Sequence, residues 1–118
     1  MSELTVQRRL TTAFINTQPV VLALIPRTKV KKPAGGFVWE DQPPRAPQTL
    51  RLIEPGGMPP PVVTADGVER TVDFELLGEH NAVIGLWDYF LHDGAEWEVV
   101  QLLHFNGWER RAVVSRRG

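Results

Sequence analysis

The sequence predicts a mainly β protein, a small antiparallel barrel or sandwich with one short helix near its N-terminal end and one long loop. The length of 118 residues corresponds to a single domain, which we assign to residues 1–118. Ten prolines and ten glycines are many for this length and favour tight turns over a helical bundle. Short apolar segments separated by Asp-Gly and Asn-Gly pairs are typical of antiparallel hairpins.

The first two expected elements are a helix over residues 5–15 and a buried strand over residues 19–27. In the first segment, apolar residues recur at helical spacing: Val6, Leu10, Ala13 and Phe14. Pro19 ends this helix, because the residue before a proline avoids the α region. The run PVVLALIPR that follows is continuously apolar and rich in β-branched residues, which is typical of a buried strand.

Residues 28–48 predict a long loop without regular structure. The segment contains four prolines and two glycines and shows no lasting apolar period. Structureless loops beyond about 15 residues are uncommon in compact domains and are usually functional or disordered. Phe37, Val38 and Trp39 lie in the middle of the loop, either at a tip or in a short strand. A Phe and a Trp are costly to leave in water, so we expect them to have a partner.

The second half of the chain predicts a series of short antiparallel strands. They are expected at residues 49–54, 62–77 (as one hairpin), 88–92, 95–103 and 108–115. Three pairs that tolerate positive φ mark the turns: Asp66-Gly67, Asp93-Gly94 and Asn106-Gly107. In the fourth of these segments, alternation predicts Trp97, Val99 and Leu103 on one face, toward the core, and Glu96 and Glu98 on the other, toward solvent.

The charged residues are unevenly distributed, although the net charge is only −1. Residues 1–51 hold eight Lys/Arg and three Asp/Glu, residues 52–109 hold one Arg and eleven Asp/Glu, and residues 110–118 hold four Arg. One interpretation is chance, with each charge simply solvated. The other is a pair of oppositely charged surfaces, which would suit head-to-tail contact between copies of the protein or a nearby polyanion.

No pattern for catalysis, cofactor binding or metal binding is present, so we expect a protein that is not an enzyme and has no cofactor or metal. The absence of cysteine removes disulfides, thiolate zinc sites and cysteine nucleophiles and fits a cytosolic fold. Ser2 and Ser115 lie near the ends, where a catalytic triad would lack rigid support. The three histidines match no zinc spacing, and no Gly-rich phosphate motif occurs. No apolar run approaches the roughly 20 residues of a membrane helix.

The basic residues gather in segments expected to be flexible. Lys29, Lys31, Lys32 and Arg45 belong to the long loop, and Arg110, Arg111, Arg116 and Arg117 to the C-terminal tail. Solvated charge is one explanation, and contact with a DNA backbone or with an acidic face of a neighbouring copy is the other. The acidic residues on both sides of Trp97 argue against a free-standing nucleic-acid reader.

Several short segments follow one another along the chain in a characteristic order. The helix and Asn16-Thr17-Gln18-Pro19 lead into VVLALIPR, followed by Lys32-Pro33-Ala34-Gly35-Gly36, an Arg-Leu-Ile strand, Asp-Gly-Val-Glu-Arg and DFELLGEHNAVI. The most specific part is the end, with Asp88-Tyr89-Phe90, Asp93-Gly94, Glu96-Trp97-Glu98-Val99-Val100 and Gly107-Trp108-Glu109-Arg110-Arg111-Ala112. In this order and spacing, most of the chain resembles the head-to-tail stopper (head-closure) proteins of siphoviruses, in their actinobacterial-phage branch.

This resemblance implies a small antiparallel β-barrel with a short N-terminal helix and a long projecting loop. It implies a ring in the virion neck, below the portal and adaptor, that closes the DNA-filled head and retains the genome. The ring would also be the docking platform for the tail terminator. Six copies are the favoured ring and twelve the next. Assembly would take place in the host cytoplasm, without a membrane or a cofactor.

The resemblance also implies roles for particular residues. The loop would reach into the channel, so that Lys29, Lys31, Lys32 and Arg45 would face packaged double-stranded DNA. Phe37 and Trp39 would anchor the loop between subunits and gain order there. Arg110, Arg111, Arg116 and Arg117 would contact a partner. Two alternatives stay open: a tail terminator or tail-completion protein, and a small oligonucleotide-binding (OB) or SH3-like nucleic-acid or protein-binding module.

Overall fold

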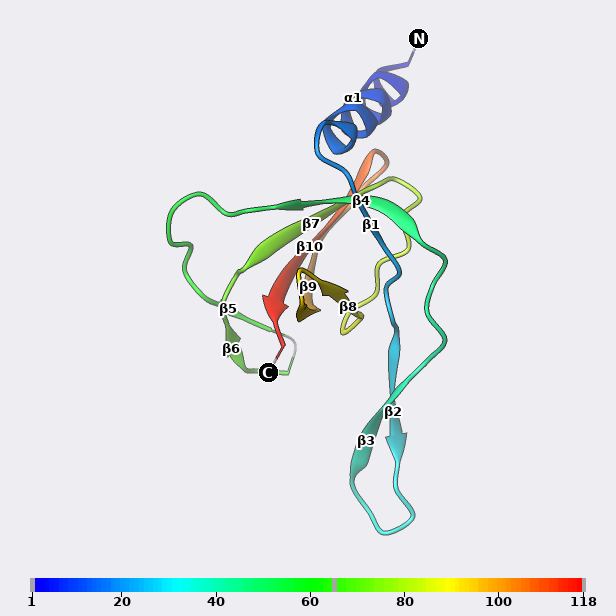
Figure 1. Cartoon of the computed structure of the whole chain (residues 1–118), viewed down its shortest axis with the longest axis vertical. Coiled ribbons are helices and arrows are strands. Elements are labelled where there is room, and N and C mark those ends of the chain that lie inside the picture. The colour runs from blue at the N-terminus through cyan, green and yellow to red at the C-terminus, as the bar shows by residue number, and fades with distance from the viewer. Residues whose placement is uncertain (1, 65, 118) are drawn as a thin grey trace.

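The computed structural model describes residues 2–64 and 66–117, and its framework is a six-stranded antiparallel sheet that curls into a barrel (Figure 1). The elements are α1 (Glu3–Thr17), β1 (Val20–Leu22), β2 (Arg27–Lys31), β3 (Phe37–Asp41), β4 (Gln48–Ile53), β5 (Val62–Val63), β6 (Glu69–Arg70), β7 (Phe74–Glu79), β8 (Tyr89–His92), β9 (Ala95–Phe105) and β10 (Glu109–Arg116). The large sheet has the order β1-β4-β7-β10-β9-β8, and β2-β3 and β5-β6 form separate hairpins. The mainly β class expected from the sequence is therefore confirmed.

The chain that follows β1 nearly closes the barrel. Beyond β1 it runs on to Ile25, which pairs with Tyr89 in β8, the strand at the other edge of the sheet. The Ile25 N–H donates to the Tyr89 carbonyl oxygen at 2.8 Å, and the Tyr89 N–H donates to the Ile25 carbonyl oxygen at 3.0 Å. β1 and its extension thus contact β4 on one side and β8 on the other, which covers two strand edges at once. Of the two architectures left open by the strand pattern, the barrel is the one observed.

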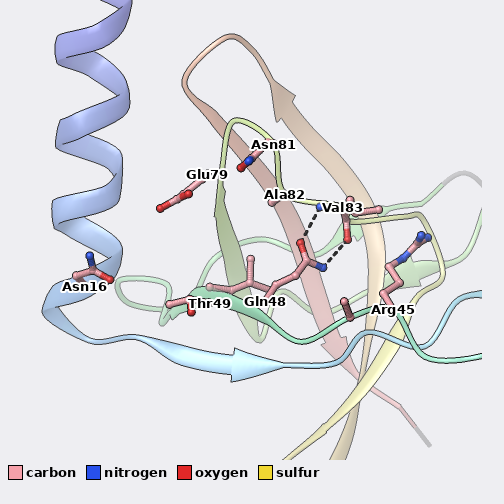
Figure 2. Close-up of a pocket in the computed structure, with 10 residues that line it drawn as sticks. Asn16, Arg45, Gln48, Thr49, Glu79, Asn81, Ala82 and Val83 are labelled. Atoms are coloured by element: carbon pink, nitrogen blue, oxygen red, sulfur yellow. Dashed lines mark hydrogen bonds between the residues drawn. The ribbon is translucent and has the colours of Figure 1, made fainter.

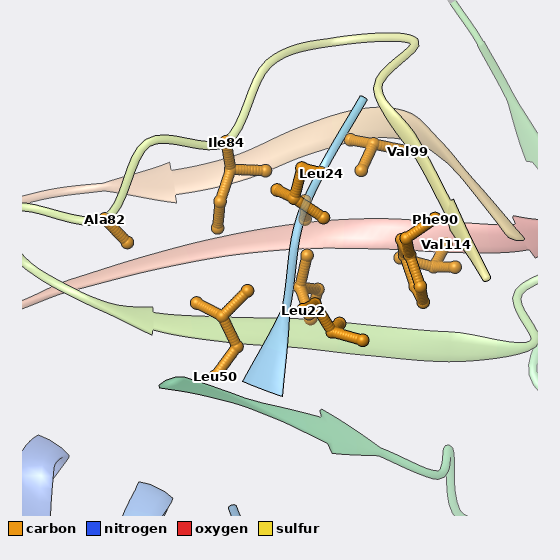
Figure 3. Close-up of a cluster of buried hydrophobic side chains, with 10 residues drawn as sticks. Leu22, Leu24, Leu50, Ala82, Ile84, Phe90, Val99 and Val114 are labelled. Atoms are coloured by element: carbon orange, nitrogen blue, oxygen red, sulfur yellow. The ribbon is translucent and has the colours of Figure 1, made fainter. Parts of the chain in front are cut away.

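Aliphatic side chains and one phenylalanine fill the inside of this barrel (Figure 3). The buried cluster consists of Leu22, Leu24, Leu50, Leu76, Ala82, Ile84, Phe90, Val99, Ala112 and Val114. Side chains alternate along a strand, so Leu22 and Leu24 point inward, while Val21 before them is 66% exposed and Ala23 between them is also exposed. Phe90, which is 1% exposed, is the largest of the buried side chains. Burial of each large apolar side chain contributes roughly 1.5–3 kcal/mol.

The helix α1 extends two residues beyond each predicted end and lies against β4 and β7. The Ser2 hydroxyl oxygen accepts the Thr5 N–H at 3.1 Å and so caps the first turn. The buried positions of the helix are Thr11 and Ile15, whereas Leu10 is 64% exposed. The apolar spacing therefore predicted the helix correctly, but the stripe that it marks does not face the barrel.

Polar contacts explain which face of α1 is turned to the barrel. The Thr12 hydroxyl donates to the Glu79 carboxylate at 3.0 Å, and Arg8 Nε donates to the Gly107 carbonyl oxygen at 2.8 Å. These bonds hold the helix to the barrel, so that only a narrow stripe of α1 contacts the barrel. Val6, Leu10 and Phe14 are left exposed.

The long loop expected over residues 28–48 is mostly regular structure. β2 and β3 pair over five residues each, and the irregular part is confined to residues 32–36 and 42–47. The expectation of a structureless segment was wrong, because a narrow two-stranded ribbon that is exposed on both faces carries no apolar alternation for the sequence to reveal.

Two other elements are shorter than expected. The predicted strand 19–27 is divided into β1, a single bridge at Ile25 and the start of β2. The predicted hairpin 62–77 is reduced to two residues in each arm, and β7 starts after a break at residues 71–73.

Within residues 2–64 and 66–117, no helix combines the length and the apolar character that crossing a membrane requires.

Candidate functional site

The candidate site is the arm, defined here as residues 27–41, which projects from the barrel at the end opposite to α1 (Figure 1). With the arm, the molecule measures 58 × 32 × 27 Å. Its register pairs Arg27 with Asp41, Lys29 with Trp39 and Lys31 with Phe37. Since paired residues share a face and side chains alternate along a strand, these side chains lie on one face of the ribbon.

Cations and aromatic rings interleave on this face of the arm. Lys29 Nζ lies 5.5 Å from the Phe37 ring centroid and 5.7 Å from that of Trp39, and the Arg27 guanidinium carbon lies 5.2 Å from the Trp39 ring. Phe37 is 60% exposed and Trp39 is 42% exposed. The cation–aromatic face, Arg27, Lys29, Lys31, Phe37 and Trp39, therefore presents apolar rings together with positive charge to the surroundings.

The tip of the arm is a tight turn held by two backbone hydrogen bonds. The Lys32 N–H donates to the Gly36 carbonyl oxygen at 2.9 Å, and the Gly35 N–H donates to the Lys32 carbonyl oxygen at 3.0 Å. Gly35 and Gly36 have φ of 92° and 78°, a region that favours glycine. Lys31 and Lys32 both lie at the far end of the arm, next to this turn. Among residues 2–64 and 66–117, no carboxylate forms an ion pair with Lys29, Lys31 or Lys32.

The root of the arm is fixed by a network of two arginines and two carboxylates, which we call the root network: Arg27, Asp66, Arg70 and Glu98. Arg27 Nη2 bonds directly to Glu98, and their side chains are only 7% and 9% exposed. Arg70 Nη1 lies 3.5 Å from the other Glu98 oxygen, and Arg70 Nη2 lies 2.9 Å from Asp66. A buried carboxylate between two guanidinium groups is well compensated, whereas loss of either partner would leave a costly buried charge.

Hydrogen bonds shift the pKa of one carboxyl group in the root network. The Thr64 hydroxyl and then the Arg70 guanidinium bind the ionised carboxylate and lower the pKa of Asp66 from 3.8 to about 2. Asp66 is solvent-exposed, so this shift describes a local turn rather than a buried centre.

Aromatic residues complete the root. Trp87 has φ of 70°, which is an unusual conformation for a bulky residue, and its ring centroid lies 6.3 Å from that of Trp39. The Trp87 carbonyl oxygen accepts from Arg27 Nε at 3.0 Å. The Tyr89 hydroxyl donates to Asp41 at 2.6 Å, and this bond raises the pKa of Tyr89. These contacts lie within one chain, so the arm has a defined direction without a neighbouring copy.

Arg45 lies apart from the three lysines with which it was grouped. Its Nε donates to Asp88 Oδ2 at 2.8 Å, and Nη2 approaches Oδ1 at 3.3 Å. Asp88 is 1% exposed and also accepts the Gly85 N–H at 3.0 Å. A Cβ on Gly85 would lie 2.8 Å from Arg45 Nη2, so this glycine makes room for the pair. Arg45 therefore neutralises a buried carboxylate of the barrel wall.

The four C-terminal arginines are separated into two pairs by the length of β10. At its start, Arg110 Nε donates to the His80 carbonyl oxygen at 2.8 Å. Arg111 lies 2.9 Å from both Glu75 and Glu109. Burial lowers the pKa of Arg111, but the hydrogen bonds that it donates to Glu109 and Glu75 outweigh this effect and raise the pKa overall.

At the other end of β10, Arg117 lies 3.6 Å from Glu96 and packs 4.5 Å from the Tyr89 ring centroid. The side chain of Arg116 is exposed. The sequence therefore grouped side chains that do not form one surface: three of the four contact their own barrel, and Arg116 faces outward.

Serine and aspartate side chains that could in principle serve catalysis or metal binding have structural roles. Ser2 caps α1, and the buried Ser115 donates to the Thr71 carbonyl oxygen. Asp66 and Asp88 are held in separate ion pairs. In the described part of the chain, no three His, Asp or Glu residues are grouped so that they could hold a metal ion.

A cavity of about 640 Å³ opens between the end of α1, β4 and the turn at residues 79–83 (Figure 2). Its central contact is Gln48, whose amide donates to the Val83 carbonyl oxygen at 2.9 Å and accepts the Val83 N–H at 2.8 Å. Glu79 in the same wall accepts from Thr12. The polar groups of this wall are used to hold the barrel and helix together, so we assign it no ligand.

Sequence reasoning missed the residues that aim the arm. Glu98 was expected on an exposed face, but it is 7% exposed and bound to Arg27, because the arm root covers it. Trp87 and Arg70 gave no local signal that they would meet there. No protein-family model matches the sequence, and the comparison with curated proteins found no significant match either.

Proposed function

We propose that this chain is a structural protein of a siphovirus neck, a head-to-tail stopper whose copies form a ring that closes the DNA-filled head. The observation that carries the proposal is the arm, which leaves a nearly closed barrel with Phe37 and Trp39 exposed and with three lysines that have no carboxylate partner among the described residues. A subunit that lines a channel needs such a reach beyond its own barrel. The proposal commits to six copies, with twelve as the next choice.

The arm lysines would act on the packaged double-stranded DNA. Lys29, Lys31 and Lys32 have no carboxylate partner among the described residues, so each is available to a phosphate. Neutralising phosphates releases condensed counterions, and the effect grows with the number of contacts. A ring multiplies this number by its copy count, so a weak contact in one subunit would become effective retention in the assembly.

The aromatic part of the arm would serve contact between subunits. Phe37 and Trp39 are exposed in the single chain, and exposed aromatic patches mark interaction sites. A ring needs heterologous contact, in which one surface meets a different surface on the next copy. Arg116, the outward-facing member of its group, would contribute to the face that meets the adaptor or the tail terminator.

The test uses the phage that encodes the chain. Without the gene, we expect heads that package DNA, lose it and carry no tail. The variant Lys29→Gln/Lys31→Gln/Lys32→Gln should join the neck but leave less nuclease-protected DNA per head. The matched variant with arginine at the same three positions should seal heads as the native chain does. Normal retention in the glutamine variant, or lysines on the outer surface of the neck in a cryo-EM map, would refute the channel role.

A second candidate function is supported by the same face of the arm. Phe37 and Trp39 beside Lys29 have the composition of a stacking platform for single-stranded nucleic acid. This candidate, an OB-like or SH3-like binding module, requires salt-dependent binding of a free oligonucleotide by the isolated chain. A flat titration at low salt excludes it.

The third candidate, a tail terminator or tail-completion protein, differs in its partner. It requires copurification with the tail tube. A stopper copurifies with the adaptor complex when no tail tube is present.

A further inference from the structure

We propose that the arm of one copy docks into a groove at the opposite end of the next copy's barrel, where an acidic rim surrounds an apolar floor. The inference rests on the proposed ring and names the surface that receives the arm. The groove is a cavity of about 510 Å³ between the start of β1, the end of β4 and the turn that follows β8.

The floor of the groove is apolar and rigid. Val20, Leu52 and Phe74 line it, and each packs from behind against the buried core of the barrel. Ile53 adds a half-buried side chain beside them. A floor of this kind excludes water from an apolar occupant without having to rearrange first.

The rim of the groove is acidic. Glu54 is exposed at the end of β4, and the Asp93 side chain is 86% exposed in the turn after β8, with His92 Nε2 at 3.4 Å. One cation, Arg51, also lines the cavity. Its guanidinium is turned to α1, where Nη1 donates to the Phe14 carbonyl oxygen at 2.7 Å, so it is bonded to the helix rather than to the rim carboxylates.

The arm has the complementary chemistry. Its tip presents Lys31 and Lys32, with the apolar Pro33 and Ala34 in the turn and Phe37 60% exposed next to them. Lys31 and Lys32 would meet the rim carboxylates, and the apolar side chains would meet the floor. In the docked ring, contact with DNA would then fall to Lys29, which lies farther from the tip. A nucleic-acid occupant is disfavoured, because the rim would repel phosphates.

The groove that receives an arm belongs to another copy. β1 and β8 are antiparallel neighbours through the pair Ile25–Tyr89, with the arm root at that end. Val20 and Asp93 lie at the other end of the same two strands. Figure 1 shows the arm leading away from the barrel. A donor and an acceptor at opposite ends form a heterologous contact, which closes into a ring when the rotation between copies permits.

The absence of native cysteine makes disulfide trapping specific. Two full-length single variants, Ala34→Cys at the arm tip and Gln18→Cys at the groove, are mixed at high concentration under mild oxidation, with a size tag on one of them. We expect a heterodimer that can only be intermolecular. Val83→Cys, an exposed position beside Gln48 at the other end of β4, is the control and should give none with Ala34→Cys.

Charge reversal adds a readout that accidental collision would not give. Lys31→Glu/Lys32→Glu in the Ala34→Cys chain should lower the cross-linking rate about tenfold, and Glu54→Lys in the Gln18→Cys chain should restore part of it. Equal trapping at residues 18 and 83, or indifference to charge, would overturn the inference. If the chain occupies the neck but the pair does not cross-link in particles, only the docking is wrong. Cross-linking by a chain that is absent from virions would refute the neck function instead.

Discussion

Replacing Arg45 with methionine separates two roles that the sequence could not distinguish. As a channel cation, Arg45 would contribute to DNA retention and little to folding. As the partner of Asp88, it neutralises a carboxylate that is 1% exposed. Methionine keeps most of the aliphatic side chain and removes only the guanidinium, so the variant tests the charge pair.

The expected cost follows from the environment of Asp88. Breaking a buried pair by removal of one partner costs roughly 3–5 kcal/mol. The Arg45 side chain is 28% exposed and Asp88 keeps the Gly85 N–H, so we take the lower end, about 3 kcal/mol. For 118 residues the unfolding entropy is about 0.25 kcal/mol/K, so the melting temperature should fall by roughly 12 °C.

Thermal unfolding followed by circular dichroism measures this change. Lys31→Met, at an exposed arm position, is the matched control and should shift the melting temperature by no more than about 2 °C. A double-mutant cycle with Asp88→Asn should show that the two losses are not additive. If Arg45→Met melts like the native chain, the ion pair contributes nothing and our assignment of Arg45 to the barrel wall is wrong.

Three further predictions concern other parts of the molecule. Because the folded pKa of Asp66 is lowered to about 2, its stabilising contribution is present above pH 3.8 and is lost as the pH falls through 2. The NMR shift of the Asp66 carboxyl carbon should therefore titrate near pH 2. A midpoint near pH 4 would contradict the contacts to Thr64 and Arg70. Phe90→Ala should lower the unfolding free energy by about 3–5 kcal/mol in urea titrations, and a loss below 1 kcal/mol would be inconsistent with a filled core. Leu10→Gln should change that free energy by less than about 0.5 kcal/mol, whereas a large loss would restore the helix face expected from the sequence.

The barrel was predictable because its signals are local. Asp93 and Gly94 both adopt positive φ, as the turn chemistry requires. Alternation along β9 placed Val99 correctly inside, but Leu103, expected on the same face, is 40% exposed, because the register of β9 against β10 shifts along the strand. The closing bridge between Ile25 and Tyr89 joins residues far apart in the chain, and no local pattern announces it.

The arm and its root were poorly predicted, because their contacts join residues that lie far apart in the chain. Arg27 and Glu98 are 71 residues apart, and Arg45 and Asp88 are 43 apart. Strand alternation assigned Glu98 to solvent, but tertiary contact with the arm root buried it. The pattern identified the composition of the arm, whereas its regular pairing and direction depend on contacts that only the folded chain makes.

These long-range pairs change the interpretation of the charge segregation in the sequence. Arg27 and Arg45 from the basic first part bind Glu98 and Asp88 from the acidic centre, and Arg111 from the basic end binds Glu75. Much of the segregated charge is therefore consumed within one chain, as separated segments fold onto each other. The lysines of the arm and the carboxylates of the groove rim take no part in these long-range ion pairs, and they lie at opposite ends of the barrel. It is this remainder, rather than the bulk segregation, that a neighbouring copy or a DNA backbone would encounter.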